Sequence, residues 1–154
     1  MDAAELRASS LGLGVHHVGI VVAGLEEAAA VYCGVLGFDR EGGVVHDRVQ
    51  KVRIQFLLDP SARIRLELLE PVGESSPVAE ALRKGGGVHH ICYETSDLER
   101  AIEGFRRQGA VLIAKPVSAP AISAAEVAFL YDRVQGIFEL VASPAVVTPG
   151  GALP

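Results

Sequence analysis

The sequence VHHVGI at 15–20 returns as VHHICY at 88–93, and the two runs start 73 positions apart in a chain of 154 residues. Superposing the two histidine pairs also aligns the residues that follow, because LEEAA at 25–29 then lies on LERAI at 98–102. An internal repeat of this kind indicates two copies of one supersecondary unit that bury their apolar faces together. The chain is therefore expected to fold as a single domain made of two similar modules.

Each copy begins with a β-branched run and continues into an amphipathic helix that ends near a glycine, at 25–37 and at 98–109. Strand-like segments follow each helix. The pattern predicts two βαβββ modules and an α+β fold. The segments expected as strands are 51–58 and 63–70 in the first copy, and 110–115, 126–132 and 136–143 in the second.

The domain boundaries follow from this pattern. The linker between the modules contains Ser76 as a predicted N-cap, Pro77 at the first helical position and three glycines as a stop. Its residues are therefore expected to form a short helix. The predicted organisation is a flexible segment at 1–13, one domain at 14–143 with modules at 14–71 and 88–143, a linker helix at 72–87, and a flexible tail at 144–154.

Composition excludes several classes of partner. The formal net charge is -5 and the sequence has no block of Lys and Arg, which argues against binding to nucleic acid. No apolar run approaches the ~20 residues of a membrane span, and the N-terminus does not resemble a signal peptide. Cys33 and Cys92 have no partner at metal or redox spacing and are expected to be buried or inert. We expect a cytoplasmic protein that binds a small molecule.

The repeat also pairs two acidic residues. Glu67 in IRLELLE and Glu139 in GIFELVA occupy equivalent positions inside apolar strands. A carboxylate turned toward the interior loses hydration worth several kcal/mol unless it is paired or bound to a metal. Something near these strands is therefore expected to compensate the two charges.

The histidine pairs are the natural candidates. Side chains alternate along a strand, so one histidine of each pair can share a concave surface with the two glutamates. Two imidazoles and two carboxylates suit a borderline or hard divalent ion. The pattern alone leaves open which histidine of each pair takes part, and a duplicated strand start with solvated glutamates and no ion is the alternative. His46, in a Gly-flanked segment, is expected to be an exposed loop residue.

The segments HHVGIVV, VYCGVLGF, IRLELLEP, SPVAEALRKGGGVHHICYE and GIFELV resemble the vicinal oxygen chelate superfamily and, within it, the methylmalonyl-CoA epimerases. The resemblance implies a curved, half-open mixed sheet around a metal site, commonly in a homodimer. It implies His17, Glu67, His90 and Glu139 as metal ligands. His16 and His89 then face away and are expected to be structural.

The resemblance also implies a reaction, the inversion of a carbon between a thioester and a carboxylate through loss and return of a proton. The opposing-face glutamate proposed as a base in some epimerases would fall near Arg53, Ile54 or Gln55, and none of these is a carboxylate. We therefore hypothesise that Glu139 and Glu67 are the catalytic proton-transfer pair, each loosening from the metal as it takes the proton.

An acyl-CoA is the implied partner and a divalent ion the implied cofactor. Nitrogen and oxygen ligands tolerate Co, Mn, Ni and Zn, with affinities that follow the general divalent series, so the sequence does not determine the metal. Scattered cations are candidates for the CoA phosphates, and 115–122 resembles a loop that could close over a substrate. The candidate cations are Lys51, Arg53, Arg83 and Lys84.

Three rival functions share this fold. A glyoxalase I-like lyase would use the same His, Glu, His, Glu set on a glutathione hemithioacetal. An Fe(II) ring-cleaving dioxygenase needs two histidines and one carboxylate, so a fourth ligand at Glu67 argues against it. A metal-free drug-binding protein of the same fold would lack the full ligand set.

Overall fold

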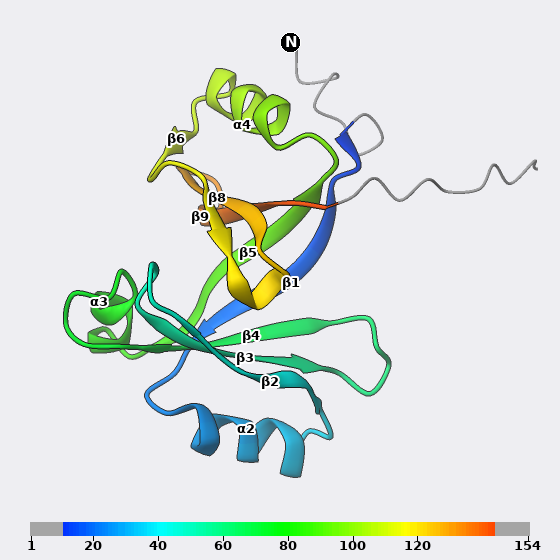
Figure 1. Cartoon of the computed structure of the whole chain (residues 1–154), viewed down its shortest axis with the longest axis vertical. Helices are drawn as coiled ribbons and strands as arrows, with labels where there is room; N and C mark the ends of the chain where they lie inside the picture. Colours follow the sequence, from blue (N-terminus) through cyan, green and yellow to red (C-terminus); the bar gives the residue numbers. More distant parts are fainter. Residues whose placement is uncertain (1–10, 144–154) are drawn as a thin grey trace, which may run out of the picture.

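The computed structural model describes residues 11–143, which form one mixed sheet of nine strands with the helices α2 and α4 on its outer side (Figure 1). The strand order is β2-β3-β4-β1-β5-β9-β8-β6, and β7 also pairs with β8. The elements are β1 Gly14–Val21, α2 Leu25–Gly34, β2 Asp39–Asp47, β3 Val52–Leu58, β4 Arg65–Pro71, α3 Ala79–Arg83, β5 Gly87–Thr95, α4 Leu98–Arg107, β6 Val111–Leu112, β7 Val117–Ala119, the 3₁₀-helix η1 Pro120–Ile122, β8 Ala125–Asp132 and β9 Gly136–Ala142.

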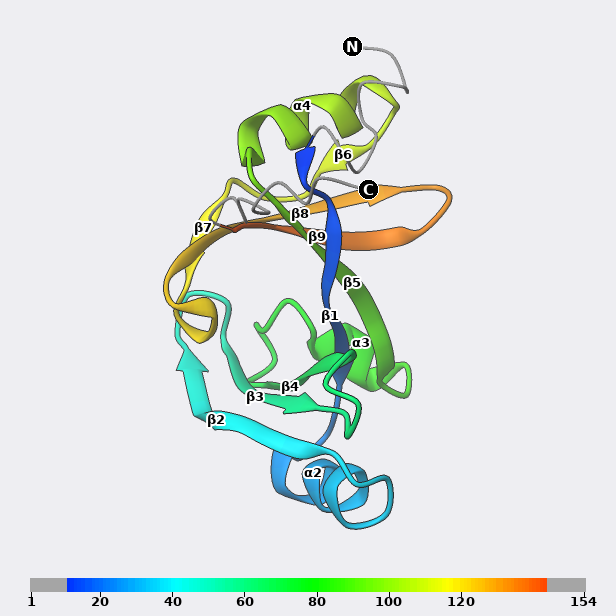
Figure 2. The ribbon, with the colours of Figure 1, turned by 90° about the vertical axis from the view of Figure 1, so that its right-hand side faces the viewer.

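The two halves of the sheet have the same connectivity. In the first half β1 pairs with β4 in parallel, and β3 and β2 follow in antiparallel order; in the second half β5, β9 and β8 repeat this pattern. The strands β6 and β7 both pair with β8 in antiparallel order, as β2 pairs with β3 in the first half. An antiparallel pairing of β1 with β5 joins the halves. The predicted α+β fold of two βαβββ modules in a curved, open sheet is confirmed, and Figure 2 shows the curvature.

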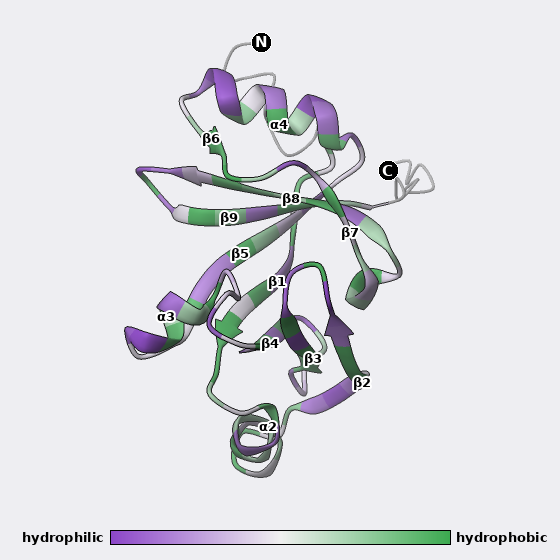
Figure 3. Cartoon of the chain, turned by 60° about the vertical axis from the view of Figure 1, so that its left-hand side comes forward, coloured by the Kyte–Doolittle hydropathy of each residue, from purple (hydrophilic) through white to green (hydrophobic). Residues whose placement is uncertain are grey.

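Strand alternation decides which side chains face the helices. Along β4, Leu66 and Leu68 pack with Leu25 and Ala29 of α2, so the intervening Glu67 points to the inner face of the sheet. Along β9, Phe138 and Leu140 pack in the same way in the cluster beneath α4, and Glu139 points inward. The outer surface of α4 is largely hydrophilic, as expected for a helix that covers a sheet (Figure 3). The packing of each helix therefore turns one glutamate toward the concave face.

The concave face is otherwise apolar. One inner cluster belongs to the first half and includes Ile54 and Leu69, and a second belongs to the second half and includes Val127 and Val141. Ile122 of η1 packs against both clusters, and η1 contacts β2 across the open side of the curve (Figure 2). The two halves are thus joined at β1–β5 and touch again at η1.

The edge strand β2 was not predicted. Its sequence, DREGGVVHD, contains a Gly-Gly pair that suggests a break, whereas in the structure the pairing with β3 shifts register between Glu41 and Val45 and then continues. His46 is exposed as expected, but it lies in this strand and not in a loop. Gln55 holds the irregular stretch, because its Nε2 donates to the carbonyl oxygens of Gly42 at 3.1 Å and Phe56 at 2.9 Å.

The segment between the modules also differs from the prediction. Only Ala79–Arg83 is helical, and Ser76 lies in the preceding turn, where its carbonyl oxygen accepts from the Ala79 N–H at 3.0 Å. The expected N-cap at Ser76 is therefore wrong. The glycines at 85–87 have positive φ and end the helix.

The N-terminal boundary lies earlier than predicted. Leu11 is fully buried in the cluster beneath α4, and its carbonyl oxygen accepts from the Thr95 hydroxyl at 3.0 Å, so the expectation of a flexible segment is wrong for this residue. The rest of that expectation at 1–10, and the predicted tail at 144–154, lie outside the described residues. Within 11–143, no helix is long and apolar enough to cross a membrane.

Candidate metal centre

The structure brings together the four side chains implied as metal ligands. His17 comes from β1, Glu67 from β4, His90 from β5 and Glu139 from β9, so each half contributes one histidine and one glutamate. All four are buried, with 0–5% of their surface exposed. They lie at the middle of the sheet, where the two halves meet.

Their donor atoms converge on one point. The Nε2 atom of His17 is 3.2 Å from the Oε2 atoms of both Glu67 and Glu139. The Nε2 atom of His90 is 3.4 Å and 3.0 Å from the same two oxygens and 3.4 Å from Nε2 of His17. Ligands about 2.0–2.1 Å from one ion are about 3.4 Å apart in a tetrahedral site and about 3.0 Å apart as octahedral neighbours. The spacing fits a single divalent ion.

Glu139 gives an independent reason to expect a cation. Its Oε2 atom is buried and has no hydrogen-bond partner of acceptable geometry in the structure. An orphaned carboxylate oxygen in the interior is costly, and a metal ion would satisfy it. The residues present therefore fit the ion that the resemblance implies.

The two histidines and two glutamates shift one another's pKa values. Burial lowers the pKa of His90, but the neighbouring carboxylates of Glu139 and Glu67 outweigh burial and raise this pKa to about 9. The pKa of His17 is raised in the same way against the effect of burial. Burial raises the pKa of Glu67 and Glu139, yet the two histidines bring both below the ordinary value. A metal ion must displace these protons to bind.

Small and aromatic residues surround the inner rings. Phe56 and Phe129 meet His17 and His90 edge to face, with centroids 5.3 and 5.4 Å apart. A Cβ atom on Gly19 would lie 2.2 Å from Cε1 of His90, so the His90 ring occupies the space that any other residue would fill. The space beside Gly19 is thus what allows His90 to reach the centre.

The outer histidines of the two pairs contact the inner ones. The Nδ1 atoms of His16 and His17 are 2.8 Å apart, and those of His89 and His90 are 2.9 Å apart. Both outer rings are half-buried. The expectation that the outer histidine faces away is wrong for His89, which lines the cleft; His16 is not among the lining residues, although it too is the hydrogen-bond partner of an inner histidine.

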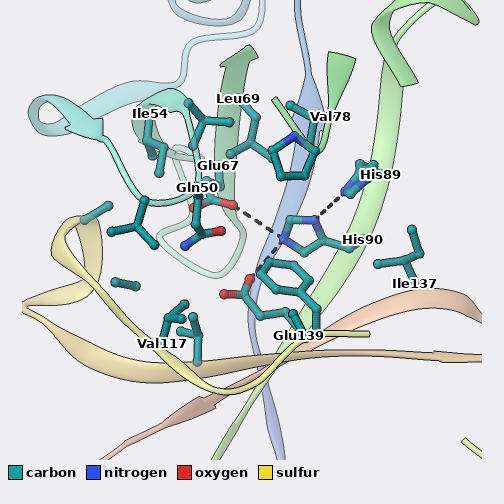
Figure 4. A pocket seen from close by; sticks show the side chains of 18 of the residues that line it. Gln50, Ile54, Glu67, Leu69, Val78, His89, His90, Val117, Ile137 and Glu139 are labelled. Carbon is teal, nitrogen blue, oxygen red and sulfur yellow. Dashed lines mark hydrogen bonds and ion pairs between the residues drawn. The ribbon is translucent and has the colours of Figure 1, made fainter. Parts of the chain in front are cut away.

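An apolar cleft of about 300 Å³ opens onto the centre (Figure 4). Its walls come from both halves, and Figure 4 shows His90 between Glu67 and Glu139, with His89 on its other side. Glu67 and Glu139 are the only carboxylates that line it within the described chain. The lining residues are Val49, Gln50, Val52, Ile54, Glu67, Leu69, Pro77, Val78, His89, His90, Ile113, Ala114, Lys115, Val117, Ala119, Ala121, Ile122, Val127, Phe129, Ile137 and Glu139.

Several of these lining residues were not identified from the sequence. The turn before β3 supplies Val49 and Gln50, and the linker supplies Pro77 and Val78, although none stands out by residue type. The segment 115–122, expected as a loop that could close over a substrate, contains β7 and η1 and does line the cleft. The place of His89 in the repeated HH is a signal in the sequence, but strict alternation along a strand predicts that this residue faces away.

Some epimerases are proposed to have a glutamate base where this chain has Arg53, Ile54 and Gln55, and these three residues have separate roles. Ile54 is buried and lines the cleft. Arg53 is not among the lining residues; it donates to Glu70 at 2.8 Å, and Glu70 accepts from the first backbone N–H of α2 at 2.8 Å. Gln55 supports the bulge in β2. None of the three places a carboxylate in the cleft.

The cations expected to meet phosphates have partners within the chain. Lys51 donates to the Ser75 hydroxyl at 3.0 Å, and Arg53 pairs with Glu70. The other two, Arg83 and Lys84, both pair with Glu80. Among the described lining residues, the Lys or Arg side chain is that of Lys115, an exposed residue that was not among the candidate cations.

Residues 16–129 match the Glyoxalase/Bleomycin resistance protein/Dioxygenase superfamily, and the chain belongs to this family. Within it, the chain is similar to an ethylmalonyl-CoA/methylmalonyl-CoA epimerase of Cereibacter sphaeroides, with 42% identity over 99 residues that cover 62% of this chain and 71% of the relative. It also matches mitochondrial methylmalonyl-CoA epimerases, and there it spans 52–56% of their length.

Solved structures lead to the same relatives. The methylmalonyl-CoA epimerase of Mycobacterium tuberculosis superposes with a TM-score of 0.74 at 30% identity, over 83% of this chain and 86% of that one. A Streptomyces coelicolor methylmalonyl-CoA epimerase variant in complex with 2-nitronate-propionyl-CoA superposes with a TM-score of 0.73 at 27% identity, over 85% and 97% of the two chains. The relatives are isomerases, and this likeness supports an epimerase function.

Proposed function

We propose that this protein is a metal-dependent epimerase that inverts the carbon between the thioester and the carboxylate of a 2-substituted malonyl-CoA, with methylmalonyl-CoA as the first substrate to test. The observation that carries the proposal is the meeting of two histidines and two glutamates at the foot of an apolar cleft. The likeness to enzymes named for this reaction supports it.

His17, Glu67, His90 and Glu139 would hold the metal. When bound, a divalent ion supplies positive charge that stabilises the enolate oxygen formed as the substrate loses its proton. The surrounding residues exclude water, since the cleft walls are mainly Val, Ile, Leu and Ala. Electrostatic stabilisation is stronger in such a site than in bulk water.

The proton is moved by the chain itself. Glu67 and Glu139 are the only carboxylates among the described lining residues, and they come from opposite halves of the sheet. We assign them as the pair in which one takes the proton from one face of the carbon and the other returns it on the opposite face. Ile54, which lines the same cleft, has no group that can do this.

Three finer features stay predictions. The metal is Co, Mn, Ni or Zn, and elemental analysis after native purification identifies it. The homodimer implied by the family resemblance is tested by light scattering. The expected cytoplasmic location is tested by cell fractionation.

The deciding experiment is deuterium incorporation at C2 of methylmalonyl-CoA in heavy water, followed by NMR with and without a chelator. We expect exchange well above the uncatalysed rate, lost on chelation and restored by added metal. Propionyl-CoA, which has the thioester but lacks the carboxylate, is the matched control substrate and should exchange far more slowly. Background exchange of methylmalonyl-CoA by metal-loaded protein would refute the epimerase assignment.

A further inference from the structure

Each outer histidine is the extra residue of a β-bulge in the pairing of β1 with β5. On β1, Val15 pairs with Tyr93 and His17 with Cys92, so His16 has no counterpart. On β5, Ile20 of β1 pairs with Val88 and Gly19 with His90, so His89 has none. A bulge bends the strand locally and can redirect a side chain next to an active site. The bulge explains how two neighbours in sequence come into ring contact instead of pointing to opposite faces.

The contact between His89 and His90 has a defined proton arrangement. Their rings meet edge to face with centroids 5.2 Å apart, and their Nδ1 atoms are 2.9 Å apart. Two nitrogens at this distance share one proton, so one ring donates and the other accepts. If His90 donates, its Nε2 is free to bind an ion beside Glu67 and Glu139. If His89 donates, neutral His90 carries its own proton on Nε2 and cannot bind one.

We propose that His89 is a positioning residue for the metal centre: its Nδ1 accepts the Nδ1–H of His90 and so holds Nε2 of His90 toward the ion. The inference rests on the metal site of the proposed function. Ligating histidines commonly donate their second N–H to a neighbouring acceptor, and removal of that acceptor typically costs 10–100-fold in metal affinity. Here a second imidazole takes the place of the usual carboxylate or carbonyl.

The surroundings of His89 favour the accepting role. Nε2 of His90 is aimed at the carboxylates of Glu139 and Glu67, so in the metal-bound protein the proton of neutral His90 would sit on Nδ1, 2.9 Å from Nδ1 of His89. The repeat counterpart His16 has a different second contact, because Nη1 of Arg65 lies 3.4 Å from its Nε2. His89 also borders the cleft, whereas His16 does not.

The test compares metal affinities of the purified protein by competition with a chelator, using Co²⁺ and Zn²⁺. His89→Phe keeps a ring but removes the acceptor, and we expect a 10–100-fold loss of affinity. His89→Asn places an amide oxygen near the lost nitrogen and should recover most of it. His46→Phe, at an exposed site on β2, is the matched control and should bind as the wild type does. Wild-type affinity in His89→Phe, or an equal loss in both His89 variants, would overturn the inference.

A second measurement needs no variant. Long-range ¹H–¹⁵N NMR of the zinc-loaded wild type should show His90 protonated at Nδ1, and a proton on Nε2 would contradict the assignment. A wild-type protein that binds neither metal removes the metal centre and this inference with it. Metal binding without epimerase activity, in contrast, overturns only the proposed function.

Discussion

At the scale of single residues, Gly19 is the position where a small change should have the largest effect. A methyl group there would lie within 2.2–2.6 Å of three atoms of the His90 ring. We expect Gly19→Ala to displace the ring, lower metal affinity by more than tenfold and cost about 1–3 kcal/mol of stability. Cobalt titration and urea unfolding measure the two effects.

The matched control for this variant is Gly14→Ala on the same strand. A Cβ atom at Gly14 would meet nothing closer than the Glu94 carboxylate at 3.5 Å, an ordinary contact. Gly14→Ala should therefore bind cobalt as the wild type does. Unchanged affinity in Gly19→Ala would mean that His90 is free to move without loss of the site.

The two glutamates should be separable by the face of the substrate on which they act. Because glutamine can still offer a neutral oxygen ligand but cannot accept the proton, Glu67→Gln should stop exchange from one epimer while metal binding largely survives. Glu139→Gln should stop exchange from the other. The measurement is deuterium incorporation starting from each epimer separately.

Glu126→Gln, at an exposed position on β8, provides the control and should leave exchange from both epimers intact. Equal activity of Glu67→Gln toward the two epimers would exclude the assignment of these residues as a two-sided proton-transfer pair.

At the scale of elements, η1 joins the two inner faces through Ile122. This side chain is half-buried and packs against the clusters of both halves. We expect Ile122→Ala to lower the free energy of unfolding by about 1–2 kcal/mol, below the usual cost at a fully buried site. It should also raise KM for the acyl-CoA more than it lowers kcat, since the residue lines the cleft but has no group that can transfer a proton. Urea unfolding and steady-state kinetics measure these changes.

Val134→Ala, in the turn between β8 and β9, removes a side chain that is 96% exposed and should change neither quantity. If Ile122→Ala is as stable as Val134→Ala, the contact at η1 does not hold the halves together.

The elements differ in how well the sequence predicts them. The helices α2 and α4 and the strands β3, β4, β8 and β9 follow from apolar periodicity, because each has one face in a core. The edge strand β2 has charged residues, a Gly-Gly pair and little burial, so its pattern resembles a loop. Its identity depends on pairing with β3, which no local pattern reveals.

The residues of the site also differ in how well the sequence predicts them. The positions of Glu67 and Glu139 follow from alternation within apolar strands, and the repeat links them to the histidine pairs. Strict alternation fails at His16 and His89, because a bulge depends on the register between two distant strands. The cleft is built from segments of both halves, and its lining could be found only from the fold.

At the scale of the whole molecule, the buried cluster makes stability depend on both pH and metal. The pKa of His90 is about 9 in the folded protein and 6.5 ordinarily, so its protonation stabilises the metal-free fold below pH 6.5 and this contribution is lost as the pH rises through 9. The pKa values of Glu67 and Glu139 are lowered by folding, so their ionisation stabilises the fold above about pH 4.5. This contribution to stability is lost as the pH falls below that value.

We therefore expect the Tm of the protein in chelator to fall between pH 6.5 and pH 9. Bound metal replaces the protons, so the gain in Tm on adding zinc should be larger at pH 9 than at pH 6.5. Differential scanning calorimetry with and without zinc measures both. A Tm in chelator that rises over this range would show that the cluster does not hold its protons as described.

The four metal ligands are divided equally between the two halves of the sheet. One module alone carries one histidine and one glutamate, so two separate modules would have to associate before they could hold an ion between them. Such an association weakens as the protein is diluted. Fusion into one chain makes the encounter intramolecular, at an effective concentration set by the short connection from β4 to β5. Formation of the centre is thereby independent of protein concentration, and each half is free to change without the other, as Gly19 and Cys92 already have at equivalent positions of the repeat.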